Sequence, residues 1–165
     1  MENEKMNIFK ILTSFGHRIP EDNYNDYLAY ILNPIEEHGL GDKFLKAFIS
    51  KVFEVKEIDI SNPDNVCINR EVGYEDKRYM DIEISNIIIQ KSGQKEEYKI
   101  CIECKTNGSS KSSYQLFEEY RLINDNRKRN CNVCLIYLTP YHKNFRFALN
   151  ETIDRIENSK KIKKP

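Results

Sequence analysis

Two acids and a lysine lie at the ends of two strand-like segments of the sequence. Side chains alternate between the two faces of a strand, so in the segment 98–105 Glu103 and Lys105 point the same way. In the segment 78–84 the same alternation separates Asp81 from the apolar residues. If the two segments pair, Asp81 comes close to Glu103 and Lys105. Two carboxylates beside an ammonium group can hold a divalent metal ion and activate a water molecule.

A plainer interpretation of these charges stays open, because opposite charges on neighbouring strands also stabilise an exposed sheet face. Against it, Glu103 and Lys105 are the only charged residues in a strand end built of Ile and Cys, and small residues follow at 107–110. This pattern favours a site with room for a substrate. Glu83 shares the predicted face of Asp81 and is either a further acid of the site or, more commonly, a surface residue. The opposite, apolar face is expected to hold Met80, Ile82 and Ile84.

The elements that must position these residues follow from periodicity. The predicted strands are 66–74, 79–90, 97–106 and 133–138, and the predicted helices are 6–15, 26–32, 44–53, 116–123 and 149–156. The last strand is almost wholly apolar, as expected of a strand covered on both faces. The core order is therefore helix, three strands, helix, strand. This order predicts an α/β fold with a central mixed sheet flanked by helices.

Length and composition fit one domain over residues 1–165. The 26 basic and 26 acidic residues cancel, but from Arg121 onward eleven Lys and Arg stand against four Asp and Glu. Binding to a phosphate backbone needs such a local excess of positive charge. The segment 158–165 is interpreted as a solvated basic tail. No apolar run is long enough to cross a membrane, and the N-terminus lacks the basic start and apolar core of a secretion signal. We therefore expect a cytoplasmic protein with reduced cysteines.

The cysteine spacing raises the alternative of a structural zinc site. Cys101 and Cys104 are three residues apart, as are Cys131 and Cys134. On a strand, however, residues three apart face opposite ways, and neither pair has the glycine turn that lets two thiolates bind one ion. Both pairs lie in apolar runs, where a thiol behaves as a small hydrophobic group. The zinc interpretation is therefore the less favoured one.

The order of elements, with an aspartate on the second strand and Glu-x-Lys on the third, resembles the PD-(D/E)XK phosphodiesterase superfamily, whose members are mostly metal-dependent nucleases. Asp81 matches the aspartate of the motif, and Glu103-Cys104-Lys105 matches its Glu-x-Lys, while Met80 replaces the proline. The segments 25–34 and 38–41 look like the opening of one uncharacterised, defence-associated branch. A glutamine-leucine pair and a tyrosine recur downstream in that branch. Here they are Gln115-Leu116 and Tyr120, with the tyrosine one residue later than usual.

The resemblance implies a restriction-endonuclease-like core over about 20–140 and a magnesium-dependent DNA endonuclease, with Mn²⁺ as a substitute metal. Asp81, Glu103 and the main-chain carbonyl of Cys104 would hold the metal. Lys105 would orient the nucleophile or stabilise the anionic transition state. The resemblance also implies that Asp26 reaches the outer shell of the metal from its helix and that Gln115 lies beside the site.

The basic run Arg127, Lys128 and Arg129 has two interpretations. It follows the end of a predicted helix, where cations complement the helix dipole, and it also suits contact with a nucleic-acid backbone. The expected partner is DNA, and a homodimer is left open. A rival hypothesis from another class is a binding or regulatory module that kept the fold without catalysis, since fold does not determine function.

Overall fold

The computed structural model describes residues 20–54, 58–74, 78–91, 93–105, 112–139 and 142–162, and the side chains at 91, 142–145 and 160–162 are not among those described. The helices are α2 (Glu21–Leu32), α3 (Lys43–Val52), the short 3-10 helix η1 (Pro63–Asn65), α4 (Ser113–Asp125) and α5 (His142–Ile162). The strands are β1 (Asp59–Ile60), β2 (Cys67–Tyr74), β3 (Arg78–Lys91), β4 (Gln94–Cys104) and β5 (Cys131–Leu138). The predicted α/β fold with a mixed central sheet is confirmed. The helix predicted over 6–15 lies outside the described residues.

The sheet is built around β3 and β4. β3 pairs antiparallel with β1 and β2 on one side and with β4 on the other, and β4 pairs parallel with β5. Gly93, with φ of +82°, forms the tight turn between β3 and β4. The β3–β4 register pairs Ile82 with Ile102 and records no further partners beyond that point among the described residues. The two strands therefore separate next to Asp81 and Glu103.

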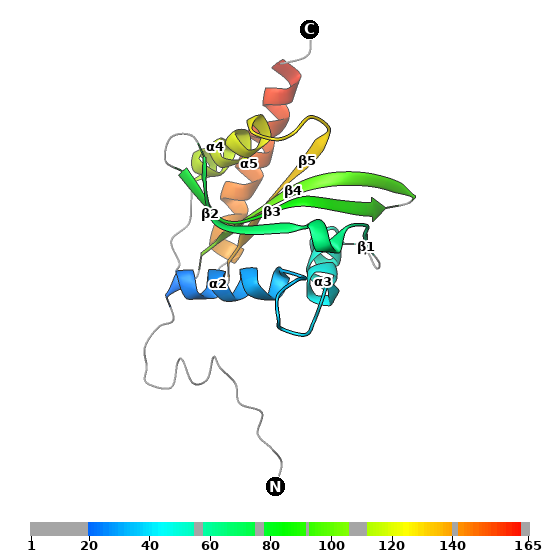
Figure 1. Ribbon diagram of the computed structural model, residues 1–165. Coiled ribbons are helices and arrows are strands. Elements are labelled where there is room, and N and C mark those ends of the chain that lie inside the picture. Colours follow the sequence, from blue (N-terminus) through cyan, green and yellow to red (C-terminus); the bar gives the residue numbers. More distant parts are fainter. Residues whose placement is uncertain are drawn as a thin grey trace.

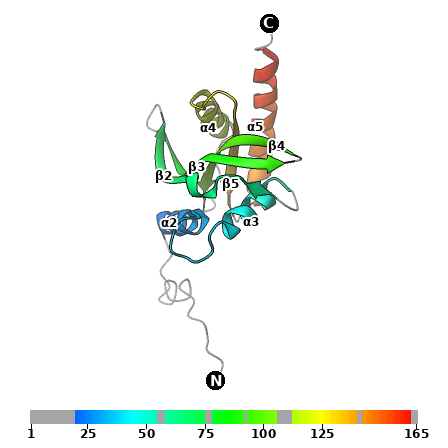
Figure 2. The ribbon, with the colours of Figure 1, turned by 45° about the vertical axis from the view of Figure 1, so that its right-hand side comes forward.

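Helices cover both faces of this sheet. Figure 1 shows α2 and α3 on one side and α4 on the other, and the turned view in Figure 2 keeps this arrangement. The larger core lies between the sheet and the first pair of helices. It includes Leu32, Leu45, Ile49, Ile82, Ile84, Ile100 and Ile102. A smaller cluster on the α4 side is formed by Met80, Cys101 and Ile123.

Two predicted burial patterns differ from the structure. The strand predicted as covered on both faces, β5, is only partly buried, and Leu138 is 44% exposed. The reason is that β5 is an edge strand of the described sheet, with β4 as its recorded partner. Met80 does not share a face with Ile82 and Ile84. It packs against Cys101 and Ile123, because the part of β3 that precedes Ile82 has no recorded partner on β4 and pairs with β2 alone.

The C-terminal helix extends further than its weak apolar spacing predicts. α5 continues to Ile162 and so takes up most of the segment interpreted as a basic tail, while 163–165 lie outside the described residues. No helix in the described ranges is long and apolar enough to cross a membrane.

The cysteines lie in positions that suit packing. Cys101 belongs to the cluster on the α4 side and Cys104 to the larger core, so the two thiols lie on opposite faces of the sheet, as predicted. Burial raises the pKa of both thiols to about 12. Since zinc binds thiolates, neutral thiols on opposite faces are a poor start for a zinc site.

Replacing Cys101 and Cys134 together by Ala tests this assignment. Each change removes a packed side chain, so we expect a loss of about 1 to 2 kcal/mol per side chain in the free energy of unfolding, measured by urea denaturation. The zinc content measured by mass spectrometry should not change. Cys67→Ala is the control, because Cys67 is exposed and should change stability little. Complete unfolding with loss of stoichiometric zinc would restore the zinc interpretation.

Candidate active site

The end of β4 is fixed by hydrogen bonds from both sides. The main-chain N–H of Cys104 donates to Oδ2 of Asp81 at 2.7 Å, at the point where β3 separates from β4. The main-chain N–H of Lys105 donates to the carbonyl of Leu138 at 2.9 Å and so extends the parallel β4–β5 ladder by one residue. The backbone that carries Glu103 and Lys105 is therefore held by β3 on one side and by β5 on the other.

The ammonium group of Lys105 lies among three oxygen atoms. Its Nζ is 3.0 Å from Oε1 of Glu103, 3.0 Å from the carbonyl oxygen of Cys104 and 2.9 Å from Oε1 of Glu21. Glu103 is 3% exposed, whereas the side chains of Lys105 and Glu21 are partly exposed. The structure thus brings Asp81, Glu103 and Lys105 together, as the strand pairing predicted. It adds Glu21, which sequence reasoning treated only as part of a helix start.

Glu21 reaches the cluster because it is the first residue of α2. Two acids in the first turn, Glu21 and Asp22, complement the positive end of the helix dipole. The buried stripe of the helix runs through Asn25, Ala29 and Leu32. Glu21 lies one turn before Asn25 on that stripe, so its side chain faces the sheet. This spacing is the signal in the sequence that could have identified it.

The charges of the cluster shift the pKa values of its members. Burial raises the pKa of Asp81 above its ordinary value, and the Cys104 N–H lowers it without cancelling that rise. The negative charges of Glu103 and Glu21 add to the rise. Burial alone would lower the pKa of Lys105, but its contacts with Glu21 and Glu103 raise it well above the usual value. Lys105 is therefore a permanent cation in this arrangement.

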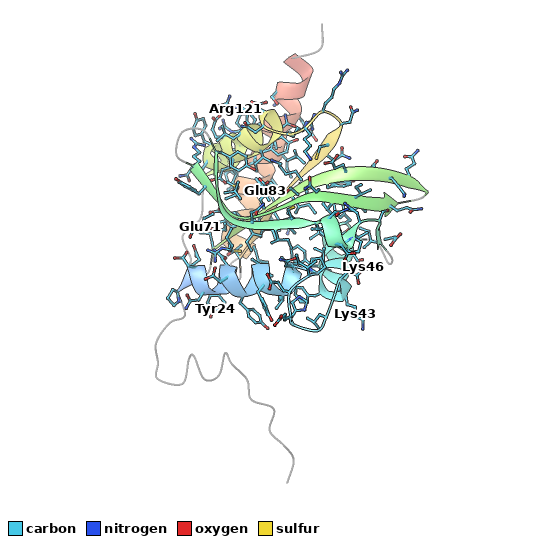
Figure 3. All side chains as sticks on the ribbon, viewed as in Figure 1. Tyr24, Lys43, Lys46, Glu71, Glu83 and Arg121 are labelled. Atoms are coloured by element: carbon cyan, nitrogen blue, oxygen red, sulfur yellow. The ribbon has the colours of Figure 1, made fainter. Side chains whose placement is uncertain are left out.

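Glu83 lies apart from this cluster and is buried. It accepts a hydrogen bond from the Tyr74 hydroxyl, and its Oε2 is 3.4 Å from Nζ of Lys99. Figure 3 shows Glu83 at the middle of the sheet, between Tyr24 on α2 and Arg121 on α4. The expectation of a surface residue is wrong, because the side chains of Tyr74 and Lys99 compensate the buried charge.

Asp26 and Gln115 have other contacts in the structure. Asp26 forms an ion pair with Arg70 of β2, and among the described contacts none joins Asp26 to Asp81, Glu103 or Lys105. The side chain of Gln115 accepts from the main-chain N–H of Ser112, while the Ser112 hydroxyl accepts from the Gln115 N–H. This pair is a capping box that begins α4. The roles of both residues in the reaction stay predictions.

The basic residues Arg127, Lys128 and Arg129 are exposed in the turn between α4 and β5. Nζ of Lys128 lies 2.8 Å from Oδ1 of Asn86 and 3.5 Å from Oε1 of Glu97. Glu97 is six residues before Glu103 on β4, which corresponds to roughly 20 Å along the strand. The basic turn is thus at the far end of the sheet from Lys105, and contact with a nucleic acid there remains a prediction.

The oxygen atoms at the end of β4 suit a hard divalent cation. Carboxylate and carbonyl oxygens already surround the positive charge of Lys105, and these are the ligand types that Mg²⁺ prefers. No three His, Cys, Asp or Glu side chains form a ready metal-binding group in the part of the chain that the structure describes. Magnesium does not require such a group, because it commonly takes one or two carboxylates and keeps several waters. Asp81, Glu103 and the Cys104 carbonyl therefore fit this ion by chemistry.

A family model described as the PD-(D/E)XK nuclease superfamily matches residues 6–162. The chain belongs to the PD-(D/E)XK nuclease superfamily. No curated protein and no solved structure matches the chain significantly. Membership of a PD-(D/E)XK nuclease superfamily indicates nucleic acid as the class of substrate, and it agrees with the mixed sheet between two layers of helices.

The substitution Asp81→Asn tests the electrostatics of the cluster without any reaction. An acid whose pKa is raised in the folded state favours folding most when protonated, and that contribution is lost as the pH rises through the folded-state pKa. Asn is neutral at every pH and can still accept from the Cys104 N–H. In a chelating buffer we therefore expect Asp81→Asn to raise the Tm near pH 7 by a few degrees, where about 1 kcal/mol corresponds to roughly 2 to 4 °C.

The gain should shrink as the pH falls toward about 4, the ordinary pKa of Asp. Asp64→Asn, at an exposed acid of η1, is the control and should change the Tm little at any pH. A lower Tm of Asp81→Asn at neutral pH would contradict the raised pKa.

Proposed function

We propose that this member of the PD-(D/E)XK nuclease superfamily is a divalent-metal-dependent phosphodiesterase that hydrolyses the DNA backbone as an endonuclease. The observation that carries the proposal is the meeting of Asp81, Glu103 and Lys105 where β3 separates from β4. A role in defence, a cytoplasmic location and a homodimer remain predictions from the sequence.

Each residue has a task that follows from its position. Asp81 and Glu103, with the Cys104 carbonyl, would hold Mg²⁺ or Mn²⁺. A bound ion of this kind lowers the pKa of a water molecule and offsets charge on the phosphate. Lys105, as a cation held at the end of β4, donates hydrogen bonds to the anionic phosphate oxygens or to the attacking water. It is not the general base, because its ammonium group carries no free electron pair.

Glu21 has a positioning task. Its carboxylate contacts the Lys105 ammonium from α2 and so sets the direction of that side chain. It also adds a third negative charge to the cluster. Glu21 is therefore a further acid of the site. The sequence-based hypothesis did not assign any residue to this contact with Lys105.

Cleavage of plasmid and single-stranded DNA with Mg²⁺, Mn²⁺ or chelator is the direct test. Because Glu103 is buried, Gln is the suitable replacement, since it keeps the volume of the side chain and removes the charge. We expect Glu103→Gln to lower the cleavage rate by about a hundredfold or more and to keep the circular dichroism spectrum. Glu157→Gln, at an exposed acid of α5, should cleave like the parent. A parent that is inactive with every metal would favour the non-catalytic binding module.

Lys105→Ala separates metal binding from catalysis. Nζ of Lys105 contacts Glu103 and the Cys104 carbonyl, two of the proposed metal ligands. The ammonium group repels a divalent ion, and at about 4 Å in water this repulsion is worth roughly 2 kcal/mol. Removing the group removes that repulsion. We expect Lys105→Ala to bind Mn²⁺ about tenfold or more tightly by isothermal titration calorimetry and to cleave far more slowly. Lys43→Ala, at an exposed lysine of α3, is the control; weaker Mn²⁺ binding by Lys105→Ala would contradict the shared ligands.

A further inference from the structure

A pocket of about 500 Å³ lies between α2 and the ends of β4 and β5, beside the proposed catalytic cluster. Its walls include Tyr24, Asn25 and Tyr27 of α2 together with Lys105 and Thr139. Its volume is within the range of roughly 300 to 1,000 Å³ that is usual for small-molecule sites. Lys105 belongs both to the pocket and to the cluster with Glu103. A group that fills the pocket therefore lies next to the residues proposed for hydrolysis.

The two tyrosines give the pocket an aromatic wall. Tyr24 and Tyr27 are three residues apart, so they are neighbours on one side of α2. They are 36% and 39% exposed, so part of each side chain reaches solvent at the pocket. Aromatic side chains of this kind are the usual stacking surfaces for unpaired bases, because every base has a flat π face.

Asn25 gives the same pocket a buried amide that lacks a hydrogen-bond partner among the described residues. It is 0% exposed, and within the part of the chain that the structure describes neither its Nδ2 nor its Oδ1 has a hydrogen-bond partner. An unpaired buried amide costs about 1 to 3 kcal/mol, so such a group needs an explanation. The amide offers a donor and an acceptor side by side, which matches the adjacent donor and acceptor on the edge of a nucleobase.

We propose that this pocket binds an unpaired nucleobase of the substrate strand, with Tyr24 and Tyr27 stacking on the base and Asn25 pairing with its edge. In a duplex both the faces and the pairing edge of a base are already used, so the base must come from a single strand or be turned out of a duplex. The proposal rests on the proposed nuclease function and names its substrate class. The base then places its own phosphate near Lys105.

Binding measured without cleavage tests the pocket. The full chain carrying Asp81→Asn is titrated, in chelating buffer at one fixed salt concentration, into a short single-stranded oligonucleotide that contains 2-aminopurine. We expect the 2-aminopurine fluorescence to be quenched by stacking. Tyr24→Ala and Tyr27→Ala on this background should each weaken binding by about tenfold, and Tyr27→Phe should bind within about twofold of the parent.

Tyr30→Ala is the matched control. Tyr30 lies on the same helix and is 40% exposed, but it packs edge-on against His38 and is not part of the pocket wall. It should bind the oligonucleotide within about twofold of the parent. Equal losses for Tyr30→Ala and Tyr27→Ala would mean that a general weakening of α2 is responsible, and this would overturn the proposal.

Asn25→Leu separates recognition from folding. Leu has the branched shape and the number of side-chain heavy atoms of Asn and leaves no unpaired polar atoms, so the Tm should stay equal or rise. Binding of the single strand should nevertheless fall several-fold. A lower Tm with unchanged binding would show that the amide has only a structural role and would overturn its assignment to the base.

Further titrations identify the source of the base. The same sequence as a fully paired duplex should bind more weakly than the single strand and should not respond to Tyr27→Ala. Free dAMP that binds as tightly as the oligonucleotide would overturn the assignment of a strand.

If tyrosine-dependent binding persists while the parent cleaves nothing with any metal, the pocket stands and the nuclease function fails. If the parent cleaves DNA and Tyr27→Ala changes neither cleavage nor binding, the pocket assignment fails and the nuclease function stands.

Discussion

The separation of β3 from β4 is the feature on which the candidate site depends. The antiparallel ladder of the two strands, which has one irregularity between Ile84 and Ile87, ends at the pair of Ile82 and Ile102, and beyond it the Cys104 N–H donates to the Asp81 carboxylate. The Asp81 side chain thus accepts the hydrogen bond of a β4 main-chain N–H beyond the last backbone pair of β3 and β4. On the other edge of β4 the parallel ladder with β5 holds the Lys105 backbone. Catalytic groups need support of this kind, because small displacements are costly for a reaction.

The charge balance of the cluster supports the proposal that it binds a divalent cation. Among the described residues, carboxylates from Glu21, Asp81 and Glu103 lie near the ammonium group of Lys105, and this leaves an excess of negative charge when all of them are ionised. Burial makes that excess costly, as the raised pKa of Asp81 indicates. A divalent ion would remove the excess, whereas a cluster serving only stability would gain from fewer acids. The arrangement is thus more readily understood as a binding site than as a source of stability.

The sequence predicted those parts of this site that depend on local periodicity. Alternation along β3 and β4 is enough to place Asp81 beside Glu103 and Lys105, because the pairing of Ile82 to Ile84 with Ile100 to Ile102 is regular and the irregularity of the ladder lies further along, between Ile84 and Ile87. Alternation fails at Met80, where the strand coils away from β4, and it could not show that β5 is an edge strand. Glu21 and Asp26 both look like acids at a helix start. Which of them faces the sheet depends on the rotation of α2, and long-range packing fixes that rotation.

Arg70 explains how that rotation is fixed. This β2 residue pairs with the Asp26 carboxylate and donates from Nη1 to the main-chain carbonyl of Asp22 at 3.0 Å, so it ties α2 to the sheet at two points. With the helix held there, Glu21 turns toward Lys105, and Asn25 and the two tyrosines line the neighbouring pocket. Asp26, expected in the outer shell of the metal, holds the helix through this ion pair, and its role in the reaction stays a prediction. One rigid element then carries groups for both the charge cluster and the pocket, so a base bound on α2 and a phosphate near Lys105 are positioned together.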